Sequence, residues 1–431
     1  MSSEPKQTPL FQRHRELGAN FSVFGGYRMP LWYPSGAKTE HLAVICRAGL
    51  FDTSHMAAIR VSGPGAPELL QQCCTRDLER CFGKDKRPLM PGMAAYGAYL
   101  NKSGGVIDDT LIYQLAHQDY LSVVNAGQGA VVSDHLRTTG GNSQVDVTDL
   151  TDRLGKLDLQ GPASVAILMK TLENPGNVLA DLLYFSFKAD QEIFPAWQTR
   201  VRLGENIPLM LSRSGYTGEM GFELFVRPQD LIAAWDLLLA AGQKEELIPC
   251  GLAARDSLRT GAVLPLSHQD IGDWPFIHHP WHIALAFTPD GTGFTKQFIG
   301  SRALLEPDRP FYTCAFVGYD LRKIAVSKNA PPQVLDEAGK PAGIVLTCVT
   351  EMAIGRDSGS RVYSVSSPDK PEGFEPRGLC CGFVRLVRPP EPGEIVSLND
   401  GRRKIRVELT RDIRPDRSAG KDINQIIEEL S

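Results

Sequence analysis

The segment Gly215-Tyr216-Thr217-Gly218-Glu219-Met220-Gly221-Phe222-Glu223 is the most glycine-dense stretch with functional side chains in this sequence of 431 residues. Glycine lets the backbone turn tightly, so one interpretation is a turn that leads into a strand at residues 222–226. The other interpretation is a backbone that lies against a flat ligand, with Tyr216 and Glu223 facing it. A carboxylate suits a ring with adjacent N–H donors, because both of its oxygens accept in one plane. Spacing alone leaves both interpretations open.

Two adjacent aspartates form a second candidate site. Asp108 and Asp109 follow the turn-like pair Gly104-Gly105 and precede a predicted strand at residues 110–115. Neighbouring residues of a strand point to opposite faces, so both carboxylates cannot line one pocket. Either both are turn residues, or one supports the turn while the other faces a ligand.

A predicted helix supplies a third candidate. Residues 251–259 follow Pro249-Cys250 and have the pattern of a helix start. Arg255 and Arg259 lie one turn apart on a single face. Their guanidinium groups either receive a ligand with carboxylates or form solvated and internal ion pairs.

Histidines gather in one stretch of the chain. It holds four of the nine histidines and three aromatic residues, which are His268, His278, His279, His282, Trp274, Phe276 and Trp281. The separation of His278 and His282 suits metal ligands on a helix, but Pro280 breaks helical geometry between them. We therefore predict no metal site, and the stretch is either a pocket wall or ordinary packing.

The composition is that of a globular protein. Hydrophobic residues make up 42% and charged residues 22% of the chain, and the formal net charge is −4. This charge argues against a nucleic-acid partner, and no apolar run reaches the ~18 residues of a membrane helix. The first residues, MSSEPKQTPLFQRH, lack the apolar core of a secretory signal, so we predict a cytoplasmic protein. The nine cysteines form no CxxC pair, and we expect them to be reduced thiols.

The character of the sequence changes near residues 307–310, Pro-Asp-Arg-Pro. Before this point, predicted helices at residues 67–74, 162–172 and 228–241 alternate with strands. This mixture indicates an α+β body of two lobes.

The segments after residue 310 are short and β-like. Hairpin turns are predicted at residues 336–339 and 399–401, which indicates a small barrel or sandwich. The predicted domains are a body at residues 8–305, a β-barrel domain at 306–415, and a tail with a short helix at 416–431.

Several motifs together resemble one protein family, the glycine cleavage T-proteins, which are folate-dependent aminomethyltransferases. These motifs follow the family order over residues 8–304. They are Thr8-Pro9-Leu10-Phe11, Met29-Pro30-Leu31, Ala48-Gly49-Leu50-Phe51-Asp52-Thr53-Ser54-His55-Met56, Gly104-Gly105-Val106-Ile107-Asp108-Asp109, Val124-Asn125-Ala126, Leu159-Gln160-Gly161-Pro162, residues 213–223, residues 251–259, and Phe298-Ile299-Gly300-Ser301-Arg302-Ala303-Leu304.

The resemblance implies a fold and a site. The fold is α+β, with a multi-lobed folate-binding body of the T-protein type, tetrahydrofolate in a central hole, and a C-terminal β-barrel. By matching position, Asp109 is the essential aspartate near the reacting end of the folate. Glu223 holds the pterin edge, with Tyr216 packed nearby. The other residues implied to line this cavity are Met56, Asn125 and Arg255.

The resemblance also implies an activity. Members of the family transfer an aminomethyl group from the lipoyl arm of a carrier protein to tetrahydrofolate and release ammonia. The protein must orient a folate nitrogen toward the one-carbon unit and exclude water. A carboxylate such as Asp109 can position this amine and stabilise the positive charge that develops on it. The implied partners are tetrahydrofolate, a one-carbon donor and a lipoylated carrier protein.

Departures from the family pattern leave a second activity open. Thr260-Gly261 stands where the family usually has Leu-Glu, and the histidine stretch is not of the usual form. The alternative is a tetrahydrofolate-dependent methyltransferase or demethylase that acts on a small methylated amine, sulfonium or methoxy compound. Its substrate-pocket candidates are His278, His279 and Trp281, because aromatic faces attract cationic methyl donors.

A third possibility is a folate-binding protein without catalysis, which would require that Asp109 is dispensable while folate still binds. Some relatives of the family are iron–sulfur maintenance proteins with a Lys-Gly-Cys-Tyr-x-Gly-Gln-Glu motif. This sequence has Lys296-Gln297-Phe298-Ile299-Gly300-Ser301 at that place. The reactive cysteine is missing, which argues against an iron–sulfur role.

Overall fold

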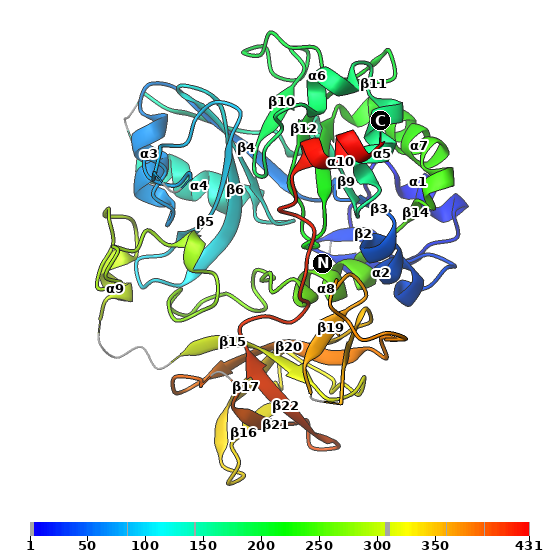
Figure 1. Cartoon of the computed structure of the whole chain (residues 1–431). Helices are drawn as coiled ribbons and strands as arrows, with labels where there is room; N and C mark the ends of the chain where they lie inside the picture. The colour runs from blue at the N-terminus through cyan, green and yellow to red at the C-terminus, as the bar shows by residue number, and fades with distance from the viewer. Residues whose placement is uncertain are drawn as a thin grey trace.

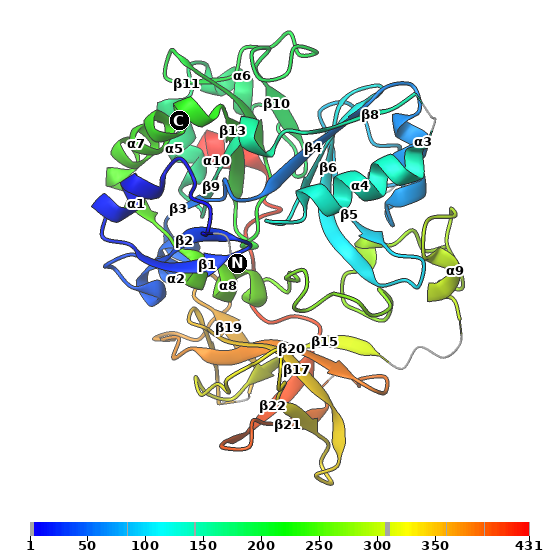
Figure 2. The same ribbon diagram turned by 180° about the vertical axis from the view of Figure 1, so that it is seen from behind.

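The computed structural model describes residues 4–83, 85–141, 144–306, 311–358, 360–391 and 393–430. Two lobes, each built on one β-sheet, lie side by side above a β-barrel. Figure 1 and Figure 2 show these three parts around a common centre.

The lobe that contains the C-terminus is built on a seven-stranded sheet with the order β10-β12-β13-β9-β3-β14, and β11 pairs with β12. Strands β3 and β14 run parallel, and the other pairs are antiparallel. Its strands are β3 (Gly49–Asp52), β9 (Gly155–Gln160), β10 (Phe187–Ala189), β11 (Arg202–Leu203), β12 (Ile207–Ser212), β13 (Gly221–Val226) and β14 (Ile248–Pro249).

Helix α7 shows why helices cover one face of this sheet. Leu231, Ala234, Trp235 and Leu238 recur every three or four residues and are all buried. They share one hydrophobic core with β9 and β13. The helix predicted at residues 228–241 is therefore confirmed, with a 3₁₀ turn in place of its first residues.

The other lobe is built on a five-stranded antiparallel sheet with the order β5-β6-β7-β4-β8. Helices α3 and α4 cover its outer face and share its core. The strands are β4 (Ala57–Ser62), β5 (Ala94–Leu100), β6 (Val106–Ala116), β7 (Asp119–Val124) and β8 (Asp146–Asp149).

The two sheets pack against each other through apolar side chains of their inner faces. Tyr113 and Val123 of the five-stranded sheet share a core with Phe225 and Met210 of the seven-stranded sheet. Because side chains alternate along a strand, Asp109 lies on the same face of β6 as Tyr113, and Glu223 lies on the same face of β13 as Phe225. The two predicted functional carboxylates thus belong to facing sheets.

The remaining elements connect these layers. The α-helices are α1 (Phe11–Glu16), α2 (Ala37–Cys46), α3 (Ala66–Cys73), α4 (Gly129–Gly140), α5 (Ser164–Thr171), α6 (Pro175–Leu179), α7 (Leu231–Ala241), α8 (Leu252–Gly261), α9 (Ser301–Leu304) and α10 (Ile423–Leu430). The 3₁₀ helices are η1 (Thr151–Arg153), η2 (Pro228–Asp230), η3 (Gln243–Glu245) and η4 (His282–Ala284). Two small hairpins are β1 (Asn20–Phe24) with β2 (Tyr27–Trp32), and β18 (Ile354–Arg356) with β19 (Val362–Ser364).

The third part is a closed barrel with the order β15-β20-β17-β16-β21-β22. Both predicted hairpins are present, between β16 and β17 and between β21 and β22. The predicted fold class, an α+β body with a C-terminal β-barrel, is confirmed. The strands are β15 (Tyr312–Gly318), β16 (Gln333–Leu335), β17 (Pro341–Glu351), β20 (Leu379–Leu386), β21 (Ile395–Asn399) and β22 (Lys404–Thr410).

The predicted boundary at residues 307–310 lies outside the described residues. The domain limits at 8–305, 306–415 and 416–431 therefore stay predictions. Within the described ranges no helix has the length and apolar character needed to cross a bilayer. All nine cysteines lie in these ranges and are free thiols.

The C-terminal tail leaves the barrel and runs past the centre of the molecule to α10, as the red segment in Figure 1 shows. Arg414, at the start of the tail, is fully buried. Its guanidinium pairs with Glu219 at 3.1 Å and with Glu351 of β17, and it donates to the carbonyl of Thr217. One arginine thus ties the glycine-rich segment 215–221 to the barrel.

Replacement of Arg414 by lysine is expected to lower the free energy of unfolding by about 2 kcal/mol, because one ammonium cannot replace bonds to three acceptors. Urea unfolding measures this change. Arg322→Lys is the matched control, since the Arg322 side chain is 72% exposed and pairs with Asp320. The control should change stability by less than about 0.5 kcal/mol. Equal losses in both variants would contradict the role given to Arg414.

Candidate active site

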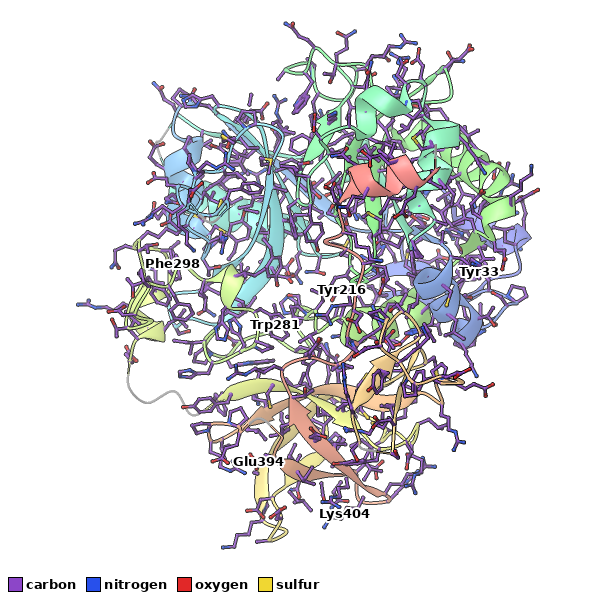
Figure 3. The ribbon with its side chains drawn as sticks, viewed as in Figure 1. Tyr33, Tyr216, Trp281, Phe298, Glu394 and Lys404 are labelled. Carbon is purple, nitrogen blue, oxygen red and sulfur yellow. The ribbon has the colours of Figure 1, made fainter. Side chains whose placement is uncertain are left out.

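A cavity of about 810 Å³ lies where the two lobes and the barrel meet. Its volume is within the ~300–1,000 Å³ of small-molecule sites. Figure 3 shows Tyr216 and Trp281 at this centre. Nine residues were assigned to the folate cavity or the donor pocket, and seven of them line this cavity, namely Met56, Asp109, Asn125, Tyr216, Glu223, Arg255 and Trp281. His278 and His279 are not among the lining residues.

Asp109 is held on the cavity wall by two donors. The Tyr96 hydroxyl donates to one carboxylate oxygen at 2.9 Å, and the Asn125 side-chain amide donates to the other at 2.6 Å. Asp108, the preceding residue, is fully buried and accepts from the Asn125 backbone at 2.7 Å and from the Ser267 hydroxyl at 2.6 Å. One aspartate therefore faces the cavity while its neighbour supports the structure, as one of the two sequence interpretations states.

The Asp109 carboxyl is protonated at a higher pH than an ordinary aspartate. Burial, and next the neighbouring charge of Asp108, raise the pKa of Asp109 to about 7. Burial also raises the pKa of Asp108. Among the described residues, no lysine or arginine pairs with either carboxylate. Such a carboxyl can exchange a proton near neutral pH, which suits a group that acts on an amine.

Glu223 is one end of a buried chain of charged side chains that continues through Lys156 and Asp158. One oxygen accepts from Lys156 at 2.6 Å, and the other accepts from the hydroxyls of Tyr113 at 2.9 Å and Ser214 at 2.7 Å. Lys156 in turn donates to Asp158 at 2.6 Å. A carboxylate has about four lone-pair positions, so Glu223 keeps capacity for one further donor from a ligand.

Arg255 of α8 ends the same chain. Its guanidinium donates to Asp158 at 2.7 Å and lies 4.9 Å from the ring centre of Tyr216. Burial alone would raise the pKa of Asp158, but the charges of Lys156 and Arg255 outweigh burial and lower it to about 2. Asp158 is therefore fully ionised, and its negative charge compensates the charge of one of its two cationic neighbours, Lys156 and Arg255.

Arg259, one turn further along α8, has a different environment. It is 1% exposed, and it pairs with Asp256 at 2.7 Å and with Asp270. Of the two alternatives for this helix face, internal ion pairing is the one the structure shows for Arg259.

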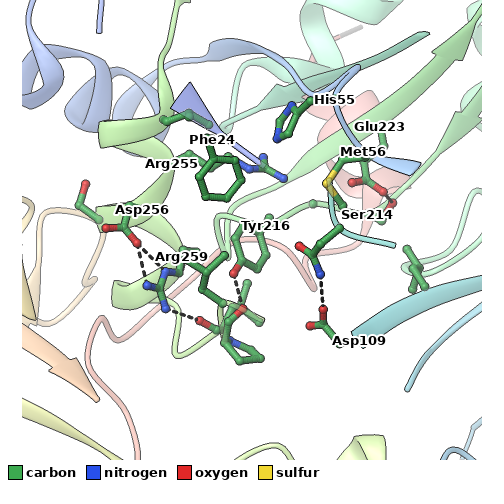
Figure 4. A pocket seen from close by; sticks show the side chains of 18 of the residues that line it. Phe24, His55, Met56, Asp109, Ser214, Tyr216, Glu223, Arg255, Asp256 and Arg259 are labelled. Atoms are coloured by element: carbon green, nitrogen blue, oxygen red, sulfur yellow. Dashed lines mark hydrogen bonds and ion pairs between the residues drawn. The ribbon is translucent and has the colours of Figure 1, made fainter. Parts of the chain in front are cut away.

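Met56 follows the turn that carries the chain from β3 in one sheet to β4 in the other. His55 beside it is almost fully buried, and burial lowers its pKa to about 4, so its ring is neutral. Figure 4 shows His55, Phe24 and Arg255 above Tyr216, and Asp109 below it. The motif at residues 48–56 thus supplies one chain connection between the two lobes and part of the cavity wall.

The histidine stretch packs mainly between the body and the barrel. His278 stacks on Tyr312 of β15 at 4.6 Å, and His279 stacks on Phe276 at 4.1 Å and on Trp281 at 5.4 Å. The assignment of His278 and His279 to a donor pocket stays a prediction. Their rings stack on neighbouring aromatic side chains, and neither residue lines the cavity. Trp281 does line it and is fixed by a bond from its indole N–H to the Val263 carbonyl at 2.7 Å.

Sequence reasoning missed several polar residues of the cavity. Lys156 lines the cavity, and its buried partner Asp158 stands two residues further along β9, so both share one face of a buried strand and this spacing was a usable signal. Charged residues on one face of an otherwise apolar strand point to a buried ion pair or a ligand site. Tyr96, Tyr113 and Ser214 are among the other polar lining residues that were missed.

A central cavity of this size between two lobes and a barrel, with one carboxylate from each of two facing sheets, defines a binding site for a small molecule. The family described as the GCVT N-terminal domain matches residues 10–288. The chain therefore belongs to the glycine cleavage T-protein family, and the family indicated by the motifs is confirmed.

Individual relatives agree over most of the chain. The aminomethyltransferase of Geobacillus kaustophilus is 39% identical over 272 residues, which cover 62% of this chain and 67% of that protein. The aminomethyltransferase of Halothermothrix orenii is 34% identical over 407 residues, which cover 94% of this chain and 99% of that protein. The crystal structure of glycine cleavage system aminomethyltransferase T from Bartonella henselae is similar with a TM-score of 0.73 and 28% identity, covering 94% of this chain and 97% of that one. The similarity extends through the barrel.

Proposed function

We propose that this protein is a tetrahydrofolate-dependent aminomethyltransferase. It transfers the one-carbon unit of an aminomethyl group, carried on the lipoyl arm of a carrier protein, to tetrahydrofolate and releases ammonia. Membership of the T-protein family and relatives named aminomethyltransferase support this activity. The observation that carries the proposal is Asp109, an uncompensated carboxylate on the wall of a cavity of suitable size.

The folate end of the cavity is the part built from the seven-stranded sheet and α8. Glu223 has a remaining acceptor position for the N–H donors of a pterin, and Met56 and Tyr216 offer apolar and aromatic surface beside it. Arg255 suits the glutamate end of a folate, because a guanidinium binds carboxylates in a planar geometry.

The reacting end is the part around Asp109. The cavity wall as a whole is mostly apolar and includes Trp281 and Ile283, and Ile283 is 62% exposed to solvent. An apolar rim suits a lipoyl arm, and a lone carboxylate suits an amine. At Asp109, with which no lysine or arginine of the described residues pairs, the carboxylate of a small donor would meet a like charge. This difference favours the aminomethyl carrier over donors such as dimethylglycine or betaine.

Two side chains have defined tasks in the reaction. Ionised Asp109 holds the attacking folate nitrogen toward the one-carbon unit and stabilises positive charge as it develops. Asn125 and Tyr96 keep the carboxylate in one orientation, so no reorganisation is needed at the moment of reaction. The surrounding apolar wall limits hydrolysis of the reactive one-carbon intermediate.

A donor panel tests this function, with tetrahydrofolate held constant. One reaction contains the aminomethylated lipoyl carrier, and the others contain dimethylglycine, betaine, a sulfonium compound or a methoxy compound. We expect 5,10-methylene-tetrahydrofolate and ammonia in the carrier reaction only, identified by mass. Formation of 5-methyl-tetrahydrofolate from a small donor would instead establish the methyltransferase or demethylase alternative, and Trp281 would then be the first residue to replace. Binding of folate with no turnover of any donor would indicate a non-catalytic folate-binding protein.

A further inference from the structure

A lysine is buried in the wall of the cavity. Lys156 of β9 is only 4% exposed, and it lines the cavity together with Glu223. A lysine is almost never fully buried unless it is paired, because its ammonium loses favourable contact with water. The transfer of the one-carbon unit gives this cation no direct task, so the contacts of its ammonium group define its role.

All three N–H groups of this ammonium have an acceptor within the protein. The Nζ atom donates to Asp158 at 2.6 Å, to Glu223 at 2.6 Å and to the Thr53 hydroxyl at 3.3 Å. An ammonium has three donors and accepts no hydrogen bond. The charged end of Lys156 is therefore fully used by the protein, and it can act on a ligand only through a carboxylate that it holds.

The two carboxylates depend on Lys156 to different extents. Arg255 donates to Asp158 at 2.7 Å, so Asp158 has a second cationic partner. Lys156 is the only cation among the described residues that pairs with Glu223. The other donors to Glu223 are hydroxyl groups, which carry no charge. The negative charge of Glu223 is therefore compensated by Lys156 alone.

The backbone of Lys156 is fixed by the segment that precedes Met56. The Lys156 carbonyl accepts from the Thr53 N–H at 3.0 Å and from the Ser54 hydroxyl at 3.1 Å, and the Lys156 N–H donates to the same hydroxyl at 3.1 Å. With both its backbone and its ammonium bound, Lys156 has one position relative to Glu223. Such a fixed donor holds a ligand-binding carboxylate in one orientation before the ligand arrives.

We propose that Lys156 is a positioning residue of the folate site, which keeps the Glu223 carboxylate ionised and oriented with its remaining acceptor position toward the pterin. This inference rests on the proposed function, because that function assigns Glu223 to the N–H donors of tetrahydrofolate. It goes further in making recognition of the pterin depend on a charge that does not contact the ligand. Without the cation, a buried carboxylate is neutralised by a proton and loses acceptor capacity.

Lys156→Met removes the cation and keeps an unbranched side chain of similar length. The Kd of tetrahydrofolate should rise about 30-fold, because the pterin donors lose a charged acceptor. The Kd of 6-methyltetrahydropterin, a ligand with the pterin end alone, should rise by a similar factor. At saturating tetrahydrofolate, kcat should change by less than about threefold, since Lys156 acts on binding and not on the reacting atoms.

The pH dependence of folate binding reports the charge of Glu223. In Lys156→Met this carboxylate gains a proton more readily, so the Kd should rise more steeply than in the natural protein when the pH is lowered from about 8.5 to about 6.5. The other groups around Glu223 do not titrate in this range, because burial raises the pKa of Tyr113 and Asp158 keeps the cation of Arg255. A merely structural role of Lys156 would leave this pH dependence unchanged.

A double-mutant cycle separates positioning of Glu223 from general support of the fold. In the Glu223→Gln background, Lys156→Met should change the folate Kd by less than about threefold, because the charge that Lys156 compensates is already absent. Lys156→Gln, which keeps a donor without the charge, should give an intermediate Kd, and it takes the place of Lys156→Met if that variant does not fold. Thermal unfolding shows whether each variant is folded.

Lys296→Met is the matched control, because Lys296 is partly buried outside the cavity and donates to the carbonyls of Gln71 and Cys74, both at 2.6 Å. It should leave the Kd of both ligands unchanged. An unchanged folate Kd in a folded Lys156 variant, or an equal loss with and without Glu223, would overturn the role of Lys156. Absence of turnover in the natural protein, with the changes in Kd present, would instead count against the proposed function alone.

Discussion

Asp109→Asn is expected to lower turnover about 1,000-fold or more while the fold and tetrahydrofolate binding are kept. Asparagine has nearly the same shape and can still accept from Asn125 or Tyr96, so the wall of the cavity is preserved. It cannot carry a negative charge, and loss of one preorganised electrostatic group typically costs about 10²–10³ in kcat. Loss of proton exchange adds to this cost, because general acid–base groups contribute about 10²–10⁴.

The measurement for Asp109→Asn is kcat with the aminomethylated carrier at saturating tetrahydrofolate. Folate affinity by titration calorimetry and the thermal midpoint serve as tests of the fold. Asp134→Asn on α4 is the matched control, since the Asp134 side chain is 77% exposed. Turnover of Asp109→Asn within about tenfold of the natural protein would contradict the role of this carboxylate in the mechanism.

Glu223→Gln is expected to weaken tetrahydrofolate binding about 100-fold, with a smaller effect on kcat at saturating folate. Glutamine can still accept from Lys156, but its amide group brings donors where Tyr113 and Ser214 already donate. The pterin donors then lose a charged acceptor, which costs about 2–3 kcal/mol. The change should appear in the Kd and KM for folate, because Glu223 is assigned to binding and not to the reacting atoms.

Stability must be measured beside affinity for this variant. Lys156 loses one of its two carboxylate partners in Glu223→Gln and keeps Asp158 at 2.6 Å. The protein should therefore stay folded, and the remaining ion pair should hold the cation. Glu246→Gln, with a side chain that is 69% exposed, is the matched control. An unchanged folate Kd in a folded Glu223→Gln variant would exclude Glu223 from the folate site.

Local signals identified several of the residues that line the cavity. The glycine-rich segment at residues 215–221 does lead into a strand, β13, and it also lines the cavity through Gly215 and Tyr216. The interpretation as a turn that leads into a strand is therefore confirmed, and contact of the segment with a flat ligand stays a prediction. Neighbouring residues of a strand face opposite sides. This rule alone predicts that only one of Asp108 and Asp109 faces the cavity.

Long-range contacts could not be predicted in the same way. Gly261 is an example: a Cβ at this position would lie 1.9 Å from an oxygen of Glu351, which comes from β17 of the barrel. The sequence shows only that Thr260-Gly261 differs from the family pattern. A side chain at residue 261 would collide with the buried carboxylate of Glu351, which lies about ninety residues later in the chain and pairs with His41 and Arg414.

The histidine stretch shows the limit of residue type as a guide. His279 and Trp281 are two apart and equally aromatic, yet only Trp281 lines the cavity. The backbone N–H of Trp281 donates to His279 at 3.0 Å, and burial lowers the pKa of His279 to about 3. A neutral histidine in a core is compatible with the sequence, but the orientation of His279 depends on the rings of Phe276 and Trp281, and Trp281 in turn contacts Phe383 of the barrel.

The most direct test of the aminomethyltransferase function is a single-turnover reaction with a carrier whose aminomethyl carbon is labelled with ¹³C. The expected result is transfer of the label to 5,10-methylene-tetrahydrofolate, with one ammonia released per labelled folate, and loss of this transfer in Asp109→Asn. Retention of the label on the carrier, together with formation of 5-methyl-tetrahydrofolate from a small methylated donor, would contradict this function.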